Sequence, residues 1–138
     1  MKQRMGITSN DHVIGLQIRT GVGVGEHSLS GNGQAQFFVE CAKAITERVN
    51  APVKWYLTTD NSQLKTNLST NYPQYIVYDP TTAYHIAKIN YSAQDKQVSL
   101  EQVSQVVAEY MLLATCNDLM ISRSGYGETA AYMLHKKR

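Results

Sequence analysis

The stretch His12-Val-Ile-Gly-Leu-Gln-Ile-Arg19 is a short apolar run that ends in an arginine, and the glycine-rich segment Thr20 to Gly33 follows it. Runs of this length that are rich in Ile and Val and closed by glycine are typical of buried β-strands. We therefore expect a strand over residues 12–19, with Arg19 at its carboxyl end and a loop after it.

Apolar strands and helical patterns alternate along the rest of the chain. A capping box at Ser99 to Gln102 marks the start of one helix, whose buried stripe is expected at Val103, Val106, Val107, Tyr110 and Ala114. Further strands are expected at 53–59, 74–78 and 119–122, and helices at 34–50, 61–68, 99–116 and 126–134. Strands separated by helices form parallel sheets with right-handed crossovers. The fold class is therefore α/β, a single Rossmann-like three-layer domain with a mainly parallel sheet.

Length and composition limit the class of protein. A chain of 138 residues with 43% hydrophobic and 17% charged residues fits one globular domain. A complete two-domain enzyme or a (β/α)₈ barrel does not fit in that length. We expect residues 1–11 to be a polar leader and residues 12–138 to be the domain. The net charge of +2 is too weak to indicate a nucleic-acid partner, and no apolar run is long enough for a membrane segment.

Missing motifs exclude several chemistries. The four histidines show no metal-ligand spacing with Cys41 or Cys116, and the two cysteines lie in apolar helical patterns that favour buried free thiols over a disulfide. The sequence has no P-loop and no G-x-S-x-G elbow. The segment Thr20 to Glu26 has the wrong spacing for a dinucleotide fingerprint, so we interpret it as a flexible or ligand-closing loop. An NAD(P)-dependent enzyme would rest on that segment alone.

Ligands of open α/β sheets bind at the carboxyl ends of the strands, which directs attention to Arg19, Asp60, Asp79 and the segment Ser122 to Glu128. Arg19 has the planar donor fork that holds phosphate, although a salt bridge at the domain edge is an equal alternative. A helix cap is the default role for Asp60, and a turn is the default for Asp79.

Two further features have both a binding and a structural interpretation. The turn Ser124 to Thr129 offers glycines, a hydroxyl and helix amides to an anion, or it is a plain helix cap at Ser124. Glu109 lies within a helical core stripe. It is either a solvated helical glutamate or an acceptor for the N–H groups of a nucleotide base.

Three stretches, in order, carry a resemblance. Ile14-Gly-Leu-Gln-Ile-Arg19 is similar to an I-G-[VI]-[HQ]-[VI]-R strand, and Trp55 to Asp60 is similar to a strand that ends in "ATD". Ala108 to Cys116 with Leu119 to Gly127 resembles an acidic helix, an L-L-S-x-[CS] segment and an S-S-F-S turn, with Gly125 in place of one serine. The chain thereby resembles the nucleotide-binding C-terminal half of GT-B-type fucosyltransferases with two Rossmann-like domains, the α1,2-, α1,6- and protein O-fucosyltransferases.

The resemblance implies a site and a reaction. Arg19 would grip the diphosphate of GDP-fucose as binder and electrostatic catalyst, and Glu109 would recognise guanine. The phosphates would lie against Ser124, Gly125 and Tyr126, with Ser122 and a largely structural Asp60 completing the nucleotide-binding set. The sequence has no D-x-D motif, which fits metal-free transfer with inversion and no cofactor beyond the donor substrate.

The partners implied are a GDP-sugar donor and a glycan or glycoprotein acceptor held by a domain outside this chain, with no nucleic acid. The domain alone would then be inactive or weak as a transferase. The compartment would be the Golgi or ER lumen for a eukaryotic source and the cytoplasm for a bacterial one. The alternative hypothesis is a non-catalytic Rossmann-like module that binds a nucleotide or a partner.

Overall fold

The computed structural model describes residues 5–20, 31–79, 96–122 and 125–136. Within these ranges, four parallel strands form one sheet in the order β3-β2-β1-β4. The strands are β1 (His12–Ile18), β2 (Val53–Thr59), β3 (Ile76–Val77) and β4 (Asp118–Ile121). The helices are α1 (Gly31–Thr46), α2 (Ser62–Asn71), α3 (Lys96–Leu113) and α4 (Gly125–Lys136).

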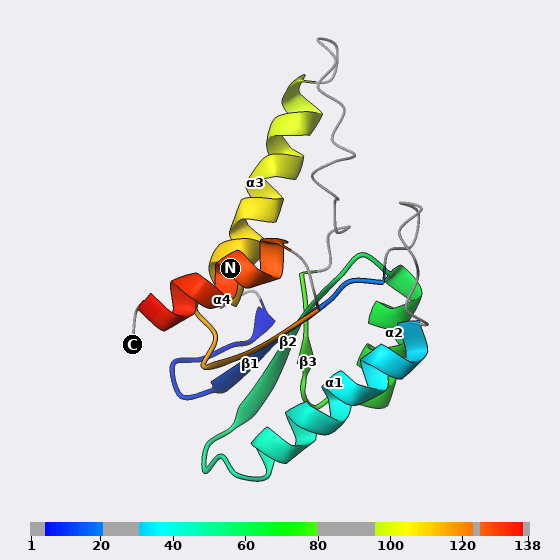
Figure 1. Ribbon diagram of the computed structural model, residues 1–138, viewed down its shortest axis with the longest axis vertical. Coiled ribbons are helices and arrows are strands. Elements are labelled where there is room, and N and C mark those ends of the chain that lie inside the picture. Colours follow the sequence, from blue (N-terminus) through cyan, green and yellow to red (C-terminus); the bar gives the residue numbers. More distant parts are fainter. Residues whose placement is uncertain (1–4, 21–30, 80–95, 123–124, 137–138) are drawn as a thin grey trace.

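The sheet is the middle of three layers. Helices α1 and α2 cover one face, and α3 and α4 cover the other (Figure 1). Side chains alternate along β1, so Ile14, Leu16 and Ile18 pack in the α1/α2 core while Val13 packs in the α3/α4 core. This arrangement confirms the predicted Rossmann-like α/β class.

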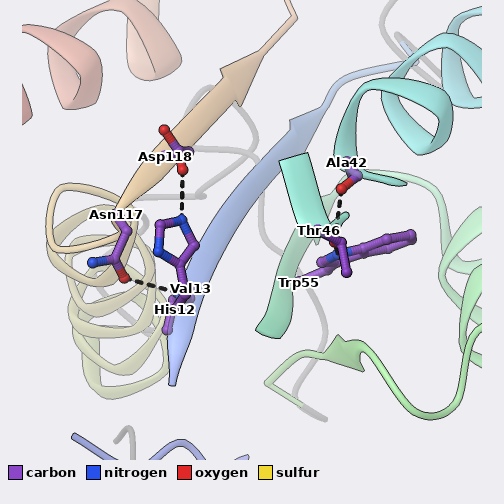
Figure 2. A network of polar contacts seen from close by, with 7 residues as sticks. All are labelled: His12, Val13, Ala42, Thr46, Trp55, Asn117 and Asp118. Carbon is purple, nitrogen blue, oxygen red and sulfur yellow. Dashed lines mark hydrogen bonds and ion pairs between the residues drawn. The ribbon is translucent and has the colours of Figure 1, made fainter. Parts of the chain in front are cut away.

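Trp55 of β2 anchors α1 to the sheet. The indole Nε1–H donates to the Thr46 hydroxyl at 3.0 Å, and that hydroxyl donates to the Ala42 carbonyl at 2.7 Å (Figure 2). The indole also stacks on Tyr75, with ring centroids 4.7 Å apart. A fully buried indole therefore has its one donor satisfied, as buried tryptophans usually do.

Strand β2 and the start of α2 match the prediction. The strand spans Val53–Thr59, and the Asn61 side chain caps α2 by accepting a hydrogen bond from the Leu64 N–H at 3.0 Å. The predicted third strand is shorter than expected, because only Ile76 and Val77 pair with β2.

The predicted bounds of two helices were wrong. Helix α1 begins at Gly31 and ends at Thr46, three residues before the expected start and four before the expected end. Helix α3 begins at Lys96, so Ser99 lies inside it and the capping box does not mark its start. A capping signal competes with the helix propensity of the residues before it, and here the helix extends through the signal.

The predicted buried stripe of α3 was wrong at Val107, which is 53% exposed, whereas Val106 and Ala114 are buried. The amino-terminal part of α3 extends past the sheet (Figure 1). Periodicity identifies an apolar face, but only the part of the face that meets another element is buried.

Three further findings concern the amino-terminal segment, the cysteines and the helices. Ile7, within the segment expected to be a leader, is buried and packs with Val13. Cys41 and Cys116 are both free thiols. None of the helices in the described ranges combines the length and apolar character that a membrane-spanning helix needs.

Candidate functional site

The strand order reverses between β1 and β4. The chain passes from β1 to β2 and β3 on one side, and then crosses to β4 on the other side of β1. Ligands of open α/β sheets bind outside the carboxyl ends of the strands at such a reversal. Arg19 directly follows β1 and Ser122 directly follows β4, so both residues lie at this reversal.

Ser122 joins β4 to β1 and is buried. Its hydroxyl accepts the Arg19 backbone N–H at 2.9 Å and donates to the Gln17 side-chain oxygen at 3.2 Å. Its own N–H donates to the Gln17 carbonyl at 2.8 Å. Because the hydroxyl already makes two hydrogen bonds, its role in the geometry is to hold the backbone of Arg19.

Asp60 joins β2 to β1 in the same way. Its carboxylate accepts the Thr20 N–H at 2.8 Å and the Thr20 hydroxyl at 3.1 Å. The default expectation that Asp60 caps the next helix was wrong, because Asn61 occupies the cap position. Hydrogen bonds to Ser122, after β4, and to Asp60, after β2, thus hold the backbone of Arg19 and Thr20.

The Nε of the Arg19 guanidinium has no hydrogen-bond partner among the residues that the structure describes. The same atom is buried. Within the same residues, the one ion pair found joins His12 and Asp118 instead. The salt-bridge alternative for Arg19 is therefore not observed in the described part of the chain. Buried donors are nearly always hydrogen-bonded in folded proteins, so this orphan donor needs an explanation such as a bound anion.

The first turn of α4 lies close to Gln17 and β4. A Cβ on Gly127 would stand 2.7 Å from the Gln17 Oε1 and 3.0 Å from the Ile121 Cβ, so a larger residue here would displace the Gln17 side chain. Gly125 is the first residue of α4. Ser124 and the side chain of Tyr126 lie outside the described residues, as does the segment 21–30. The first turn of a helix has amide N–H groups without intrahelical partners, which suit an anion.

Glu109 of α3 is buried, with 7% of its surface exposed. Burial raises the pKa of its carboxyl, and the negative charge of Asp79 adds to the rise. Lys65 and a hydrogen bond with the Thr58 side chain act in the opposite direction on that pKa. The interpretation of Glu109 as a solvated glutamate was therefore wrong. Buried carboxyls with perturbed pKa values cluster at functional sites.

Lys65 of α2 lies beside the end of β3. Its Nζ donates to the Asp79 carbonyl at 3.4 Å and stands 5.2 Å from the centroid of the Tyr78 ring. Sequence reasoning selected Asp79 as a strand-end acid but missed Lys65 and Thr58. Thr58 carries a usable signal, a polar residue near the end of an apolar strand, whereas a lysine in a polar helix carries none.

Sequence reasoning also assigned no partner to Gln17, which binds Ser122 and touches α4. A glutamine inside an apolar strand is itself a signal, because its amide must find hydrogen bonds in the fold. Among the described residues, no three His, Cys, Asp or Glu side chains gather as a metal-binding group.

The fold and the site define a class, an open Rossmann-like α/β domain with an arginine, at the reversal of strand order, whose buried Nε has no partner in the described part of the chain. No protein-family model matches the chain, and no curated protein sequence matches it.

Solved structures do match. The structure of NodZ alpha-1,6-fucosyltransferase co-crystallised with GDP is 18% identical, with a TM-score of 0.63 over 96% of this chain and 38% of that chain. The same enzyme soaked with GDP-fucose gives a TM-score of 0.64 at 18% identity, with the same coverage of both chains. A structure of fucosyltransferase NodZ from Bradyrhizobium gives 0.62 at 17% identity, over 94% of this chain and 38% of that chain. The similarity confirms the resemblance to fucosyltransferases at the level of the fold. The chain spans 38% of the length of these neighbours.

Proposed function

We propose that the chain is the donor-binding domain of an inverting fucosyltransferase and that it binds GDP-fucose. The observation that carries the proposal is the buried, unpartnered Nε of Arg19 at the carboxyl end of β1. A guanidinium at this position has the charge and the donor geometry for a diphosphate. Fold neighbours crystallised with GDP and soaked with GDP-fucose support the nucleotide.

The proposed chemistry needs stabilisation of a leaving group. As the acceptor oxygen bonds to the anomeric carbon of fucose, the bond from that carbon to the diphosphate oxygen breaks, and GDP takes the electron pair. The attack is in line, so the anomeric configuration inverts. Arg19 and the amides at the start of α4 stabilise the negative charge that develops on GDP. Preorganised donors of this kind do not require a metal.

The other nucleotide contacts are part of the same proposal. The Glu109 carboxylate accepts hydrogen bonds from the N–H edge of guanine, because an ionised carboxylate has only acceptors to offer. Ser124, Gly125 and Tyr126 contact the phosphates, while Ser122 and Asp60 hold Arg19 and Thr20 in place.

We propose that the acceptor site and the general base lie outside these residues. The coverage supports this proposal, since the chain spans 38% of the length of its fold neighbours. We therefore expect donor binding to survive in this chain and transfer to a glycan or glycoprotein to be weak or absent.

Thermal unfolding with and without GDP tests the proposal. GDP should raise the midpoint of the wild type because it binds the folded state alone. Arg19→Ala should abolish the rise, whereas Arg48→Ala should keep it because Arg48 is exposed and lies between α1 and β2. A folded wild type whose midpoint does not move at saturating GDP would contradict the proposal. A rise with NAD but not with GDP would favour a dinucleotide site instead.

A further inference from the structure

Gln17 is a polar side chain inside the apolar strand β1. Side chains alternate along the strand, so Gln17 lies on the same face as Val13, the face that α3 and α4 cover. The residue is buried, with 6% of its surface exposed. An apolar residue would pack on this face without the cost of burying an amide, so the amide has to be explained by what it binds.

The Gln17 amide lies at one end of a short chain of hydrogen bonds. Its Oε1 accepts the Ser122 hydroxyl at 3.2 Å, and the oxygen of that hydroxyl accepts the Arg19 backbone N–H at 2.9 Å. Ser122 is buried as well. A hydroxyl proton rotates to suit its partners, so the Gln17 acceptor keeps that proton away from Arg19 and leaves a lone pair for the Arg19 N–H. Gln17 therefore fixes the hydrogen bond that holds the backbone of Arg19.

The same Gln17 oxygen lies next to the first turn of α4. Gly127 is the third residue of that helix, and a Cβ there would stand 2.7 Å from the Gln17 Oε1. The pairing of β1 with β4 brings the groups together, since Gln17 pairs with Ile121, whose own Cβ would stand 3.0 Å from the Cβ on Gly127. One side-chain atom thus lies between the hydroxyl that holds Arg19 and the start of a helix.

We propose that Gln17 is a positioning residue for the diphosphate of the donor. Through Ser122 it holds the backbone of Arg19, and as a spacer against Gly127 it sets how far the first turn of α4 stands from Arg19. The inference rests on the proposed GDP-binding function and adds a residue to it. A diphosphate engages both groups at once, whereas the single phosphate of GMP engages either one alone, so Gln17 contributes to a preference for GDP over GMP. Gln17 itself does not contact the nucleotide.

Nuclear magnetic resonance titrations with GDP and GMP test this role, because they measure weak as well as tight binding. Gln17→Met keeps the length of the side chain but removes the acceptor. The preference for GDP over GMP should fall about 10-fold, as expected for the loss of one well-placed hydrogen bond. Without ligand, the backbone amide of Arg19 should exchange its hydrogen with solvent faster than in the wild type, because its acceptor is no longer fixed.

Gly127→Ala perturbs the same contact from α4. The new Cβ would displace the Gln17 side chain, so this variant should also lose preference for GDP although Gln17 is still present. Alanine favours a helix more than glycine does, so this variant keeps the proposal testable if Gln17→Met does not fold. An unchanged preference in Gly127→Ala would overturn the role of Gln17 as a spacer.

A double-mutant cycle with Ser122→Ala shows whether Gln17 acts through Ser122. If it does, Gln17→Met should lower the GDP preference much less in the Ser122→Ala background than in the wild type. Losses that add in the double variant would overturn the proposal.

Gln63 of α2 offers a matched control. Its side-chain amide is exposed and donates to the Asn67 side chain at 2.9 Å, within the same helix. Gln63→Met makes the same chemical change away from Arg19 and should leave the ratio of GDP to GMP affinity unchanged.

The outcomes separate the two proposals. A wild type that does not bind GDP overturns the proposed function and this inference together. A wild type that binds GDP, with the same GDP-to-GMP ratio in Gln17→Met, overturns the inference alone. A loss in Gln17→Met that is equal for GDP and GMP also overturns it, because it would mean that Gln17 supports the fold of the whole site and not the diphosphate contacts.

Discussion

The strands of the sheet begin at one side, the amino edge, and end at the other, the carboxyl edge, and these two sides differ in how their charged groups are paired. At the amino edge, His12 Nε2 lies 2.6 Å from the Asp118 carboxylate, and the Val13 N–H donates to the Asn117 side chain at 2.8 Å (Figure 2). At the carboxyl edge, Arg19 has a buried Nε without a partner and Glu109 is a buried carboxyl.

This difference distinguishes polar groups that stabilise the fold from polar groups that are available to a ligand. Polar groups that pair with one another at the amino edge have no unsatisfied charge left to offer a ligand. This holds even though a pocket of about 400 Å³ lies there, lined in part by Asp11 and Asn117. The pKa of Asp11 is lowered by its hydrogen bonds with Thr8, so that carboxylate is also engaged within the fold. Unsatisfied and desolvated charge is the reason for choosing the carboxyl edge as the candidate site.

The largest expected effect is the loss of ligand binding in Arg19→Ala. We expect GDP affinity, measured by titration calorimetry, to fall about 100-fold, because at least two charge-assisted hydrogen bonds are lost. The midpoint of the free protein should not fall, since the substitution removes a buried donor that has no partner. A large fall in stability with unchanged GDP affinity would mean that Arg19 stabilises the fold and does not bind the ligand.

Ser122→Ala should show how much the hydrogen bonds at the carboxyl edge stabilise the fold. It leaves the Arg19 N–H and the Gln17 side chain without their hydrogen bonds, so the free energy of unfolding should fall by about 2 kcal/mol. Urea unfolding measures this change. Ser9→Ala is the control, because Ser9 is exposed and should change stability little. Equal stabilities of the two variants would mean that Ser122 does not hold the edge.

Glu109→Gln should alter the pH dependence of stability. The folded-state pKa of Glu109 is raised, so its stabilising contribution is complete below the unfolded-state pKa and is lost as the pH rises through the folded-state value. The neutral amide avoids that loss. We therefore expect the variant to gain stability relative to the wild type at neutral pH but not at acidic pH, in thermal melts at matched pH. Parallel pH profiles would contradict the raised pKa.

The smallest effect is expected at the amino edge. Asp118→Asn weakens the pair with His12, and both side chains are partly exposed, at 38% and 22%. Partly exposed pairs contribute about 0.5 kcal/mol, and added salt reduces that further. Chemical unfolding at low and high salt measures the loss, and GDP affinity should be unchanged. A fall in GDP affinity here would break the contrast between the two edges.

Much of the fold could be predicted because its signals are local. The apolar run 53–59 is a strand with the expected bounds, and Asn61 caps the helix that follows. Helix bounds were less predictable, since α3 extends through its capping box and exposes Val107 where it passes beyond the sheet. A residue's neighbours in the chain do not reveal whether another element covers it.

The candidate site was also predictable only in part. The alternation of strands and helices, together with the rule for strand ends, was enough to select Arg19, Asp60, Asp79 and Ser122, because that rule needs only the order of elements. Only the tertiary structure decided what each residue does. It placed Ser122 on the backbone of Arg19 across 103 positions of sequence, left the guanidinium without an ion-paired carboxylate among the described residues, and buried Glu109. Crossovers between parallel strands join distant segments, so such partnerships are set by packing and not by local pattern.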